Sequence, residues 1–366
     1  MRVVIDAVPL LVRSAGVKNY LYYWIQHLRR AAGTDTIRTF PALGELGPLT
    51  HQQSVAGWWP TFSGLASLAL ANHAGIPPAG RSAREADIFH VSSLLKNPPR
   101  RGRLTATIHD MTCWLMPELH PEANRRADRS FAEILKRADA VIAVSQSTKD
   151  DSVRVLGLAP EKITVIHSGV SDAFFEVPAD DMWRVKERYR LHRPFVLFIG
   201  TIEPRKNIDT LLDAYTSLEL ALQVEFDLVV AGPSGWAPRE TVVRLSQKGV
   251  RYLGYVPEPD IAPLTAAAAV FAYPSLYEGF GFPVAQAMAA GVPVITSNVS
   301  SLPEVTGNAA LLVDPRSTWE LRNALTRLLQ SPDLRSELGE RGRCHAHGFR
   351  WDACAAKSLS FFKAVL

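Results

Sequence analysis

Short runs of branched apolar residues alternate along this chain with segments whose apolar residues recur every three or four positions. The first kind of run predicts buried strands, and the second predicts helices that connect them. The predicted strands are Val3–Ile5, Ile88–Val91, Leu104–Ile108, Ala140–Val144, Ile163–Ile166, Phe195–Ile199, Phe226–Ala231, Val250–Tyr252, Ala269–Tyr273, Val292–Thr296 and Ala310–Val313. Helical patterns between them include Glu122–Arg137, Ile208–Leu220 and Trp319–Gln330. This alternation is typical of an α/β fold with parallel sheets.

The second half of the chain opens with a new first strand. A charged helical stretch, Met182–Tyr189, is followed by the apolar run RPFVLFIG. Because a single hydrophobic core rarely grows past roughly 250–300 residues, a chain of 366 residues is expected to form two domains. We therefore predict α/β domains over residues 1–180 and 181–348. The tail, residues 349–366, has an amphipathic pattern that could pack back across either domain.

The composition is that of a globular protein without a recognisable export signal. Hydrophobic residues make up 47% of the chain, and the mean hydropathy is +0.01. Asp6 and Pro9 interrupt the apolar start, which therefore predicts a buried strand rather than a signal peptide. The excess of 40 basic over 36 acidic residues suits an anionic substrate or membrane surface, but it is also common in ordinary cytosolic proteins. The basic residues are scattered, so nucleic acid is not an expected partner.

The cysteines and histidines do not predict a metal site or a disulfide framework. Cys113, Cys344 and Cys354 form no CxxC pair and are odd in number, which favours a reducing cytoplasm. The sequence has neither the cysteine–histidine cluster of a zinc site nor the acidic loop of a calcium site. No metal is therefore expected.

One segment is unusual because it has no charged residue from Leu46 to Gly80. It includes Trp58–Pro60 and is too short and too interrupted by proline to cross a bilayer, which needs about 20 apolar residues. One interpretation is an interfacial segment whose Trp58 and Trp59 enter the lipid headgroups. The other, which we favour here, is a loop and helix packed near the site of an acceptor.

The most informative stretch is YEGFGFPVAQAMAAG, residues 277–291. Glu278 stands just before a Gly-Phe-Gly turn, and Pro283 and Gly291 punctuate the apolar segment that follows as a short helix. A glycine turn that leads into a helix offers backbone N–H groups and the positive end of the helix dipole to an anion. An enzyme that handles a sugar nucleotide needs amides of this kind for the diphosphate and a carboxylate for the sugar hydroxyls. Taken alone, the stretch could equally be an ordinary loop and helix of an α/β domain.

Other candidate residues follow predicted strands, where ligands bind in open α/β sheets. Gly200 ends one strand, and the adjacent cations Arg205 and Lys206 come shortly after it. Gly254 and Tyr255 end another strand, where they could meet a nucleotide base. In the first half, the sequence TIHD (residues 107–110) places a histidine and an aspartate directly after a strand. A lone histidine in such a place is usually structural, so its interpretation depends on the remaining motifs.

Taken in order, these motifs resemble the retaining glycosyltransferases of the GT-B type, in particular the large family 4 (glycosyl transferases group 1) with its signature of two glutamates separated by seven residues. The resemblance extends over nearly the whole chain. The matching motifs are TIHDMTCW, ADAVIAVSQSTKDD, VIHSGV, FIGTIEPRKNIDTLLDAY, LGYVPEPDIAPL, YPSLYEGFGFPVAQAMAAGVPVITS, SLPEVTGNAALLVDP and FRW. The resemblance implies two Rossmann-like domains that face each other across a cleft. The first would bind the acceptor, the second would bind the nucleotide sugar, and the tail helix would cross back to the first.

The resemblance also implies roles for individual residues. Arg205 and Lys206 match the pair that binds the diphosphate, Glu278 matches the carboxylate that contacts donor-sugar hydroxyls, and His109 matches a histidine near the anomeric centre. These four are the expected catalytic residues. The expected donor-binding residues are Arg205, Lys206, Gly16, Gly200, Gly254, Tyr255, Glu278, Gly279, Phe280, Gly281, Phe282 and Gln286. No metal and no cofactor beyond the donor substrate are implied.

The sequence departs from the family pattern at two positions. The second glutamate of the signature is Gln286, whose uncharged amide should weaken the hydrogen bonds to ribose hydroxyls by perhaps ~1 kcal/mol. Lys18 stands in the loop Ser14–Tyr20 where a second glycine is common, and it could touch phosphate or stiffen the loop.

Four functions remain in view. The first is transfer of a sugar, with GDP-mannose as the first expected donor, to a glycan or lipid-linked glycan acceptor of a bacterial surface polysaccharide, in the cytoplasm and with possible contact with the inner membrane. The second is a scaffold of the same fold that binds nucleotide sugar but has lost transfer, as Gln286 and Lys18 would suggest. A nucleotide-sugar epimerase would need further acid–base groups around the sugar. A dinucleotide oxidoreductase would need a GxGxxG motif after the first strand, which is absent.

Overall fold

The computed structural model describes residues 1–14, 16–73, 85–92, 94–99 and 101–366, and these form two compact units. Unit 1 consists of Met1–Gly169 together with Trp351–Leu366, and unit 2 consists of Val170–Arg350. The boundary that we expected near residue 180 therefore lies earlier in the chain. The short 3-10 turn Asp172–Phe174, just after the observed boundary, packs against helices of unit 2, and Phe174 and Phe175 are buried there.

Unit 1 contains a six-stranded parallel sheet with the order β2-β1-β3-β4-β5-β6. Its strands are β1 (Arg2–Asp6), β2 (Thr36–Phe40), β3 (Ile88–Val91), β4 (Arg103–Ile108), β5 (Ala140–Ala143) and β6 (Ile163–Val165). Its helices of four or more residues are α1 (Gly16–Ala31), α2 (Trp58–His73), α4 (Thr112–Leu115), α5 (Glu122–Arg137), α6 (Gln146–Leu156) and α16 (Trp351–Val365), together with the 3-10 helix η1 (Val8–Leu11). Five of these strands were predicted, and the edge strand β2 was missed.

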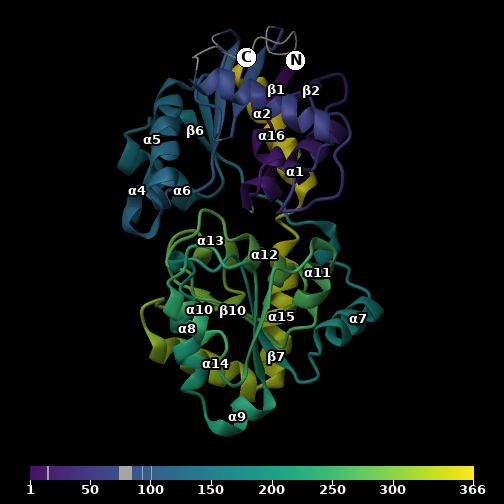
Figure 1. The fold of residues 1–366 in the computed structure, drawn as a ribbon, viewed down its shortest axis with the longest axis vertical. Helices are drawn as coiled ribbons and strands as arrows, with labels where there is room; N and C mark the ends of the chain where they lie inside the picture. Colours follow the sequence, from purple (N-terminus) through teal and green to yellow (C-terminus); the bar gives the residue numbers. More distant parts are fainter. Residues whose placement is uncertain (15, 74–84, 93, 100) are drawn as a thin grey trace. The chain divides into compact units, whose positions relative to one another are not determined.

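The helix α16 packs along α1 and completes the core of unit 1 (Figure 1). Trp24 Nε1 of α1 donates a hydrogen bond to Ser358 Oγ of α16 at 2.9 Å, and the rings of Trp24 and Phe362 lie 6.0 Å apart. Trp351 packs so closely on Gly169 that a Cβ atom there would overlap the indole. The amphipathic tail pattern of Trp351, Leu359, Phe361 and Phe362 thus corresponds to side chains that are buried in unit 1.

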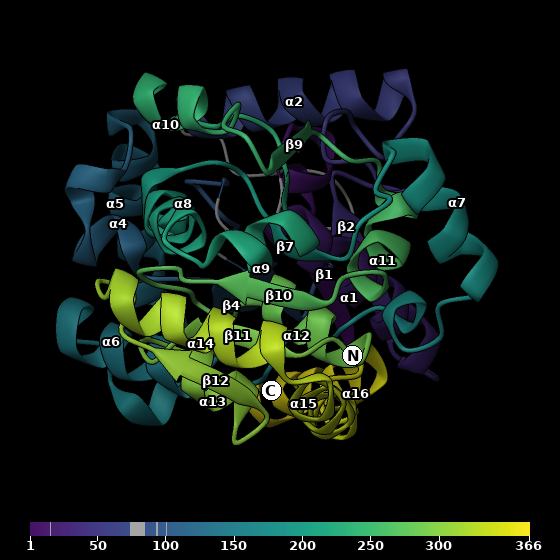
Figure 2. The same cartoon turned by 90° about the horizontal axis from the view of Figure 1, so that it is seen from below.

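Unit 2 contains a second six-stranded parallel sheet, with the order β12-β11-β10-β7-β8-β9. Its strands are β7 (Phe195–Ile199), β8 (Asp227–Ala231), β9 (Val250–Gly254), β10 (Val270–Tyr273), β11 (Val294–Ser297) and β12 (Ala310–Val313). Its helices are α7 (Ala179–Tyr189), α8 (Ile208–Thr216), α9 (Leu220–Glu225), α10 (Arg239–Arg244), α11 (Glu258–Ala266), α12 (Phe282–Ala289), α13 (Leu302–Thr306), α14 (Thr318–Gln330) and α15 (Pro332–Ala346). Figure 2 shows β10, β11 and β12 side by side, with α14 close to them.

The strand order of unit 2 reverses direction between β7 and β10. From β7 the chain continues through β8 to β9 on one side, and then it returns to place β10, β11 and β12 on the other. Ligands of open α/β sheets bind at such a switch point, beyond the carboxyl ends of the two strands that flank it. The segments after β7 and β10 are therefore the first place to look for a site.

Within the described ranges, no helix is both long and apolar enough to cross a bilayer. The uncharged segment that begins at Leu46 forms a loop and then α2, and its residues 74–80 lie outside the described part of the chain. The helix α2 packs against η1 in unit 1.

Candidate active site

The predicted residues of unit 2 meet at the switch point between β7 and β10. Arg205 and Lys206 lie in the short 3-10 turn Pro204–Lys206 that follows β7, and Glu278 follows β10. The two segments are joined through their backbones, because the N–H of Leu276 donates to the carbonyl of Arg205 at 2.8 Å. Glu278 therefore shares one site with an adjacent pair of cations that lies 72 residues from it in the sequence.

Glu278 lies at the centre of a buried charge cluster. Its Oε1 accepts hydrogen bonds from Lys206 Nζ at 2.6 Å and from Ser275 Oγ at 2.7 Å, and its Oε2 lies 3.0 Å from Arg205 Nη1. Arg205 Nη2 also forms an ion pair with Glu203 at 2.8 Å. The four charged side chains are only 6% to 14% exposed, so two cations and two carboxylates balance each other out of contact with most of the solvent.

This balance sets the protonation states of the cluster. Burial would raise the pKa of Glu278, but Arg205, Lys206 and the hydrogen bonds from Lys206 and Ser275 outweigh it and lower this pKa to about 2. Burial and then repulsion from Arg205 lower the pKa of Lys206, whereas attraction to Glu278 and Glu203 opposes that effect. Glu278 is therefore ionised at neutral pH. The ammonium of Lys206 also lies 5.2 Å from the centre of the Tyr273 ring, a cation–π contact that favours its charged form.

Two serines from the segment after β11 hold the turn that carries Glu278. The N–H of Glu278 donates to Ser300 Oγ at 3.0 Å. Ser301 Oγ donates to the carbonyl of Glu278 at 2.9 Å and to that of Phe280 at 3.0 Å. Sequence reasoning assigned no role to these serines, nor to Glu203 or Ser275. Glu203, Ser275 and Ser301 lie within motifs already quoted, whereas Ser300 lies between two of them, and nothing local in the sequence shows which groups these side chains reach.

The helix after this turn has the boundaries that its punctuation predicted. Gly281 precedes α12 with φ at 94°, a conformation that favours glycine, and a side chain there would press against Leu302. Pro283 lies in the first turn, and Gly291 follows the helix with φ at 73°. The helix α12 begins at Phe282, so its N-terminus, with the positive end of its dipole, comes four residues after Glu278.

The other predicted donor-binding residues of unit 2 lie along the same edge of the sheet. The N–H of Gly200 donates to the carbonyl of Ala231 at 2.9 Å, and the N–H of Gly232 donates to the carbonyl of Gly254 at 2.7 Å, so the ends of β7, β8 and β9 are joined. Tyr255, just after β9, is partly exposed. Gly279, Phe280 and Phe282 belong to the turn and first residue of α12, and Gln286 is half-buried further along that helix.

Two predicted site residues, His109 and Gly16, belong to unit 1. His109 follows β4, and its Nε2 is buried without a hydrogen-bond partner among the described residues. Burial lowers the pKa of His109 to about 4, although Asp110 opposes this, so the imidazole is neutral at pH 7. Its ring meets Tyr20 of α1 edge-on, with the ring centres 4.8 Å apart. Gly16 is the exposed first residue of the same helix.

Lys18, the unexpected cation near the start of α1, is buried. Its Nζ donates hydrogen bonds to the carbonyls of Thr50 at 3.1 Å and Gln53 at 2.7 Å, in the loop that leads to α2. Burial lowers the pKa of Lys18 to about 8. The side chain therefore ties the start of α1 to this loop. The loop predicted over Ser14–Tyr20 is wrong in part, because the residues from Gly16 onward belong to α1.

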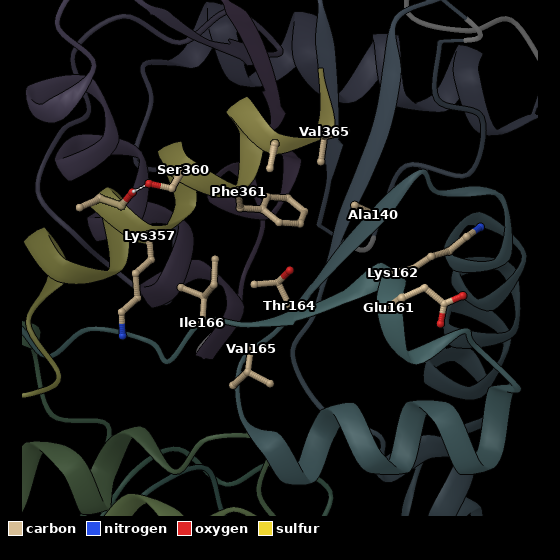
Figure 3. A pocket seen from close by; sticks show the side chains of 12 residues that line it. Ala140, Glu161, Lys162, Thr164, Val165, Ile166, Lys357, Ser360, Phe361 and Val365 are labelled. Atoms are coloured by element: carbon tan, nitrogen blue, oxygen red, sulfur yellow. Dashed lines mark hydrogen bonds between the residues drawn. The ribbon is translucent and has the colours of Figure 1, made fainter.

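Two cavities lie in unit 1 apart from these residues. A groove of about 620 Å³ separates the edge strand β6 from α16, and in Figure 3 Phe361 of α16 points into it opposite Thr164. A smaller cavity of about 210 Å³, beyond the end of β4, is lined in part by Trp114, Arg125 and Asp128. Burial raises the pKa of Asp128 to about 6. Among the residues that the structure describes, no three histidine, cysteine or acidic side chains gather in a way that could hold a metal ion.

Each of the two units matches a known protein family. The family described as Glycosyltransferase Family 4 matches residues 14–174, and the one described as Glycosyl transferases group 1 matches residues 180–345. The O-antigen chain mannosyltransferase B of Escherichia coli is 35% identical over 274 residues, which are 73% of this chain and 72% of that protein.

Solved structures share the whole fold. Sucrose-phosphate synthase from Thermosynechococcus elongatus aligns with a TM-score of 0.72 at 22% identity, over 100% of this chain and 99% of its own. HepE from Anabaena, solved in complex with UDP and glucose, aligns with a TM-score of 0.71 at 18% identity over 100% of both chains. At these identities the likeness concerns the fold, which is the two-domain α/β fold of the GT-B glycosyltransferases.

Proposed function

This chain belongs to glycosyltransferase family 4, the group 1 glycosyl transferases, and from that membership we propose that it transfers a hexose from a nucleotide diphosphate sugar to a glycan or lipid-linked glycan. Mannose is the first candidate, carried as GDP-mannose, because the relative from Escherichia coli is named a mannosyltransferase. The product would be part of a bacterial surface polysaccharide such as an O-antigen or an exopolysaccharide.

The observation that carries the proposal is the cluster of Glu278, Arg205 and Lys206 at the switch point of unit 2. A diphosphate leaving group needs positive charge beside it, and Arg205, Lys206 and the N-terminus of α12 supply that charge. A sugar needs acceptors for its hydroxyls. Among the described residues, Glu278 Oε1 already has two donors, whereas Oε2 faces Arg205, so Oε2 retains capacity for a sugar hydroxyl.

We propose that the reaction retains the anomeric configuration. The bond from the anomeric carbon to the diphosphate oxygen breaks while the acceptor oxygen approaches the same face of the sugar, and the departing diphosphate takes the acceptor proton. Arg205 and Lys206 hold the negative charge that develops on the leaving group. His109, neutral at pH 7, would donate to or accept from a sugar hydroxyl near the anomeric carbon. Since cations and a helix dipole supply the charge, we propose that no divalent metal is required.

The remaining donor-binding residues follow from the same assignment. Gln286 would accept hydrogen bonds from the ribose, and Gly254 and Tyr255 would border the base. Gly16, with the start of α1, would approach the diphosphate from unit 1, which also receives the acceptor. Its small cavity beyond β4 is lined in part by Trp114 and Asp128, an aromatic and an acidic side chain, which suit a sugar ring. The enzyme would act in the cytoplasm, at the inner face of the membrane where lipid-linked acceptors are presented.

Thermal unfolding with GDP, UDP, ADP and dTDP tests the donor. A nucleotide that binds the folded protein at 100 times its Kd stabilises it by about 2.7 kcal/mol, and we expect GDP to raise the melting temperature most. Stabilisation by none of the four would contradict the nucleotide-sugar site.

Transfer assays with GDP-mannose and a lipid-linked acceptor test the chemistry. We expect Arg205→Ala and Lys206→Ala each to lower turnover by roughly 10²–10³. Near-normal turnover by both variants, with folding checked by circular dichroism, would remove these two residues from the mechanism.

A further inference from the structure

The large apolar side chains of α2 lie on its exposed face. A helix on a protein surface usually buries its large apolar residues and exposes its polar ones. In α2 the buried residues are instead Gly64 and Ala71. The exposed apolar residues, which we call the α2 face, are Trp58 (67% exposed), Trp59 (71%), Phe62 (58%), Leu65 (36%) and Leu70 (57%).

This orientation of α2 is fixed by contacts within unit 1. Gly64 lies so close to Pro41 and Leu11 that a Cβ atom would overlap both side chains, and no larger residue could face inward there. At the other end, Asn72 donates to the carbonyl of Leu94 at 3.0 Å and accepts from the N–H of Lys96 at 2.8 Å. Because the inner side of α2 is closely packed, the aromatic residues have no room to turn inward.

The α2 face has the chemistry of an interfacial segment. The rings of Trp58 and Trp59 meet edge-on with centres 4.5 Å apart, and Trp58 stacks on Phe62 at 5.7 Å. Indole rings favour the boundary between water and lipid because one part of the ring is apolar and the other donates a hydrogen bond. The sequence from Leu46 to Gly80 has neither an acidic residue that would repel anionic headgroups nor a lysine or arginine that would attract them. The exposed Lys96, on the loop to which α2 is bonded, adds positive charge nearby.

We propose that the α2 face docks unit 1 onto an anionic phospholipid bilayer, with the rings of Trp58, Trp59 and Phe62 in the headgroup region. The inference rests on the proposed function in one respect, namely that a lipid-linked acceptor is presented at such a surface. A second copy of the chain fits the face less well. A stable protein interface uses about 20–30 residues a side, whereas the α2 face is a single ridge of five.

Sedimentation of the full chain with vesicles tests the proposal. The vesicles contain phosphatidylglycerol and phosphatidylethanolamine, and phosphatidylcholine vesicles serve for comparison. We expect binding to the anionic vesicles, and a loss of affinity of about tenfold per indole in the double variant Trp58→Ser/Trp59→Ser. The matched control is Trp183→Ser/Trp319→Ser, whose indoles on α7 and α14 are each 67% exposed. This control should bind like the wild-type protein.

A second variant guards against an effect on folding. Phe62→Asp keeps both indoles, and subtracting the spectrum of the Trp58→Ser/Trp59→Ser variant separates their emission from that of the other six tryptophans. The wild-type emission should shift to shorter wavelength on anionic vesicles, and the shift should be lost in Phe62→Asp, with unchanged melting temperatures. Equal vesicle binding by the wild-type protein and both α2 variants would overturn the proposal. The proposal would also be overturned if the wild-type protein bound no vesicles and gel filtration showed it to be a dimer that the α2 substitutions dissociate.

A transfer assay separates this inference from the proposed function. With a nucleotide-sugar donor and a water-soluble acceptor analogue, the Trp58→Ser/Trp59→Ser variant should be as active as the wild-type protein. If the wild-type protein transfers no sugar but its vesicle binding depends on the α2 face, the function is wrong and the docking surface stands. If transfer is normal and vesicle binding is absent, the proposed function stands and the docking surface is wrong.

Discussion

Replacing Glu278 with glutamine should destabilise unit 2 in a way that depends on pH. The substitution removes one charge from a balanced cluster and leaves the buried Arg205 and Lys206 with Glu203 as their acidic partner. The pKa of Glu278 falls from 4.5 to about 2 on folding, and at about 1.4 kcal/mol per pKa unit this contributes about 3 kcal/mol to the free energy of unfolding at pH 7. The known cost of removing one partner of a buried ion pair, about 3–5 kcal/mol, is of the same size.

The sign of the pH effect follows from the direction of this shift. The folded protein holds the Glu278 carboxyl in its ionised form more strongly than the unfolded chain does. The stabilisation is therefore complete above pH 4.5 and is lost as the pH falls from 4.5 towards 2. The difference between the wild-type protein and Glu278→Gln should shrink across the same range.

Hydrogen exchange in urea measures this difference in unit 2 alone. Peptides that cover β7 and β10 report on the sheet beside the cluster, which matters because two compact units need not unfold in one transition. Glu225→Gln, at an exposed residue of α9, is the matched control and should cost less than about 0.5 kcal/mol. Adding Lys206→Met to Glu278→Gln removes the uncompensated ammonium and should restore about 1–2 kcal/mol. Equal effects of Glu278→Gln and Glu225→Gln at pH 7, or a difference that persists at pH 2, would refute the reasoning.

Three further predictions concern other parts of the chain. Gln286→Glu should tighten nucleotide binding by about fivefold, since a charged acceptor strengthens the ribose hydrogen bonds by about 1 kcal/mol, and calorimetry that shows abolished binding would contradict the ribose assignment. Lys18→Met removes the hydrogen bonds to the carbonyls of Thr50 and Gln53, which should cost about 1–2 kcal/mol of local stability. Amide exchange in residues 46–57 should therefore accelerate by roughly tenfold. Unchanged exchange would show that Lys18 does not stabilise this loop. Burial, with repulsion from His109, lowers the pKa of His90 to about 3, so the folded protein binds fewer protons than the unfolded chain below pH 6.5. Unit 1 should lose about 2 kcal/mol from this group between pH 7 and pH 5, and His90→Gln should flatten that loss in urea titrations.

The buried strands were predictable because parallel strands covered on both faces require continuous apolar runs. All eleven predicted strands are present, and their ends agree within two residues. The missed strand, β2, lies at the edge of its sheet and reads TIRTF, in which Ile37 and Thr39 are buried and Arg38 is exposed. Four of its five residues favour strands, but the run is short and carries a charge, so it lacks the continuous apolar character of the predicted strands; pairing with β1 completes it. The predicted helix Ile208–Leu220 ends instead at Thr216, and a separate helix begins at Leu220.

The meeting of the candidate residues was predictable only in part. Residues that follow adjacent parallel strands must lie at one edge of the sheet, so the proximity of Arg205 and Glu278 follows from their places in the sequence. The pairing of these charges also depends on residues that carry no signal of their own. Glu203, two residues before Arg205, forms an ion pair with it, and Ser300 and Ser301 fix the backbone of Glu278 from the segment after β11. Lys18 likewise lies among backbone carbonyls about 32 residues away, which local sequence cannot indicate.

The chain leaves unit 1 at Gly169 and returns to it at Trp351, so all of unit 2 interrupts the sequence of unit 1. During synthesis, α1 and the sheet of unit 1 are made before α16, and all of unit 2 is translated in between. The apolar surface that Trp351 and Phe362 later cover is exposed on the nascent polypeptide throughout that interval. At about 5–20 residues per second, the delay lasts on the order of ten to forty seconds, which makes unit 1 a natural client for a ribosome-associated chaperone.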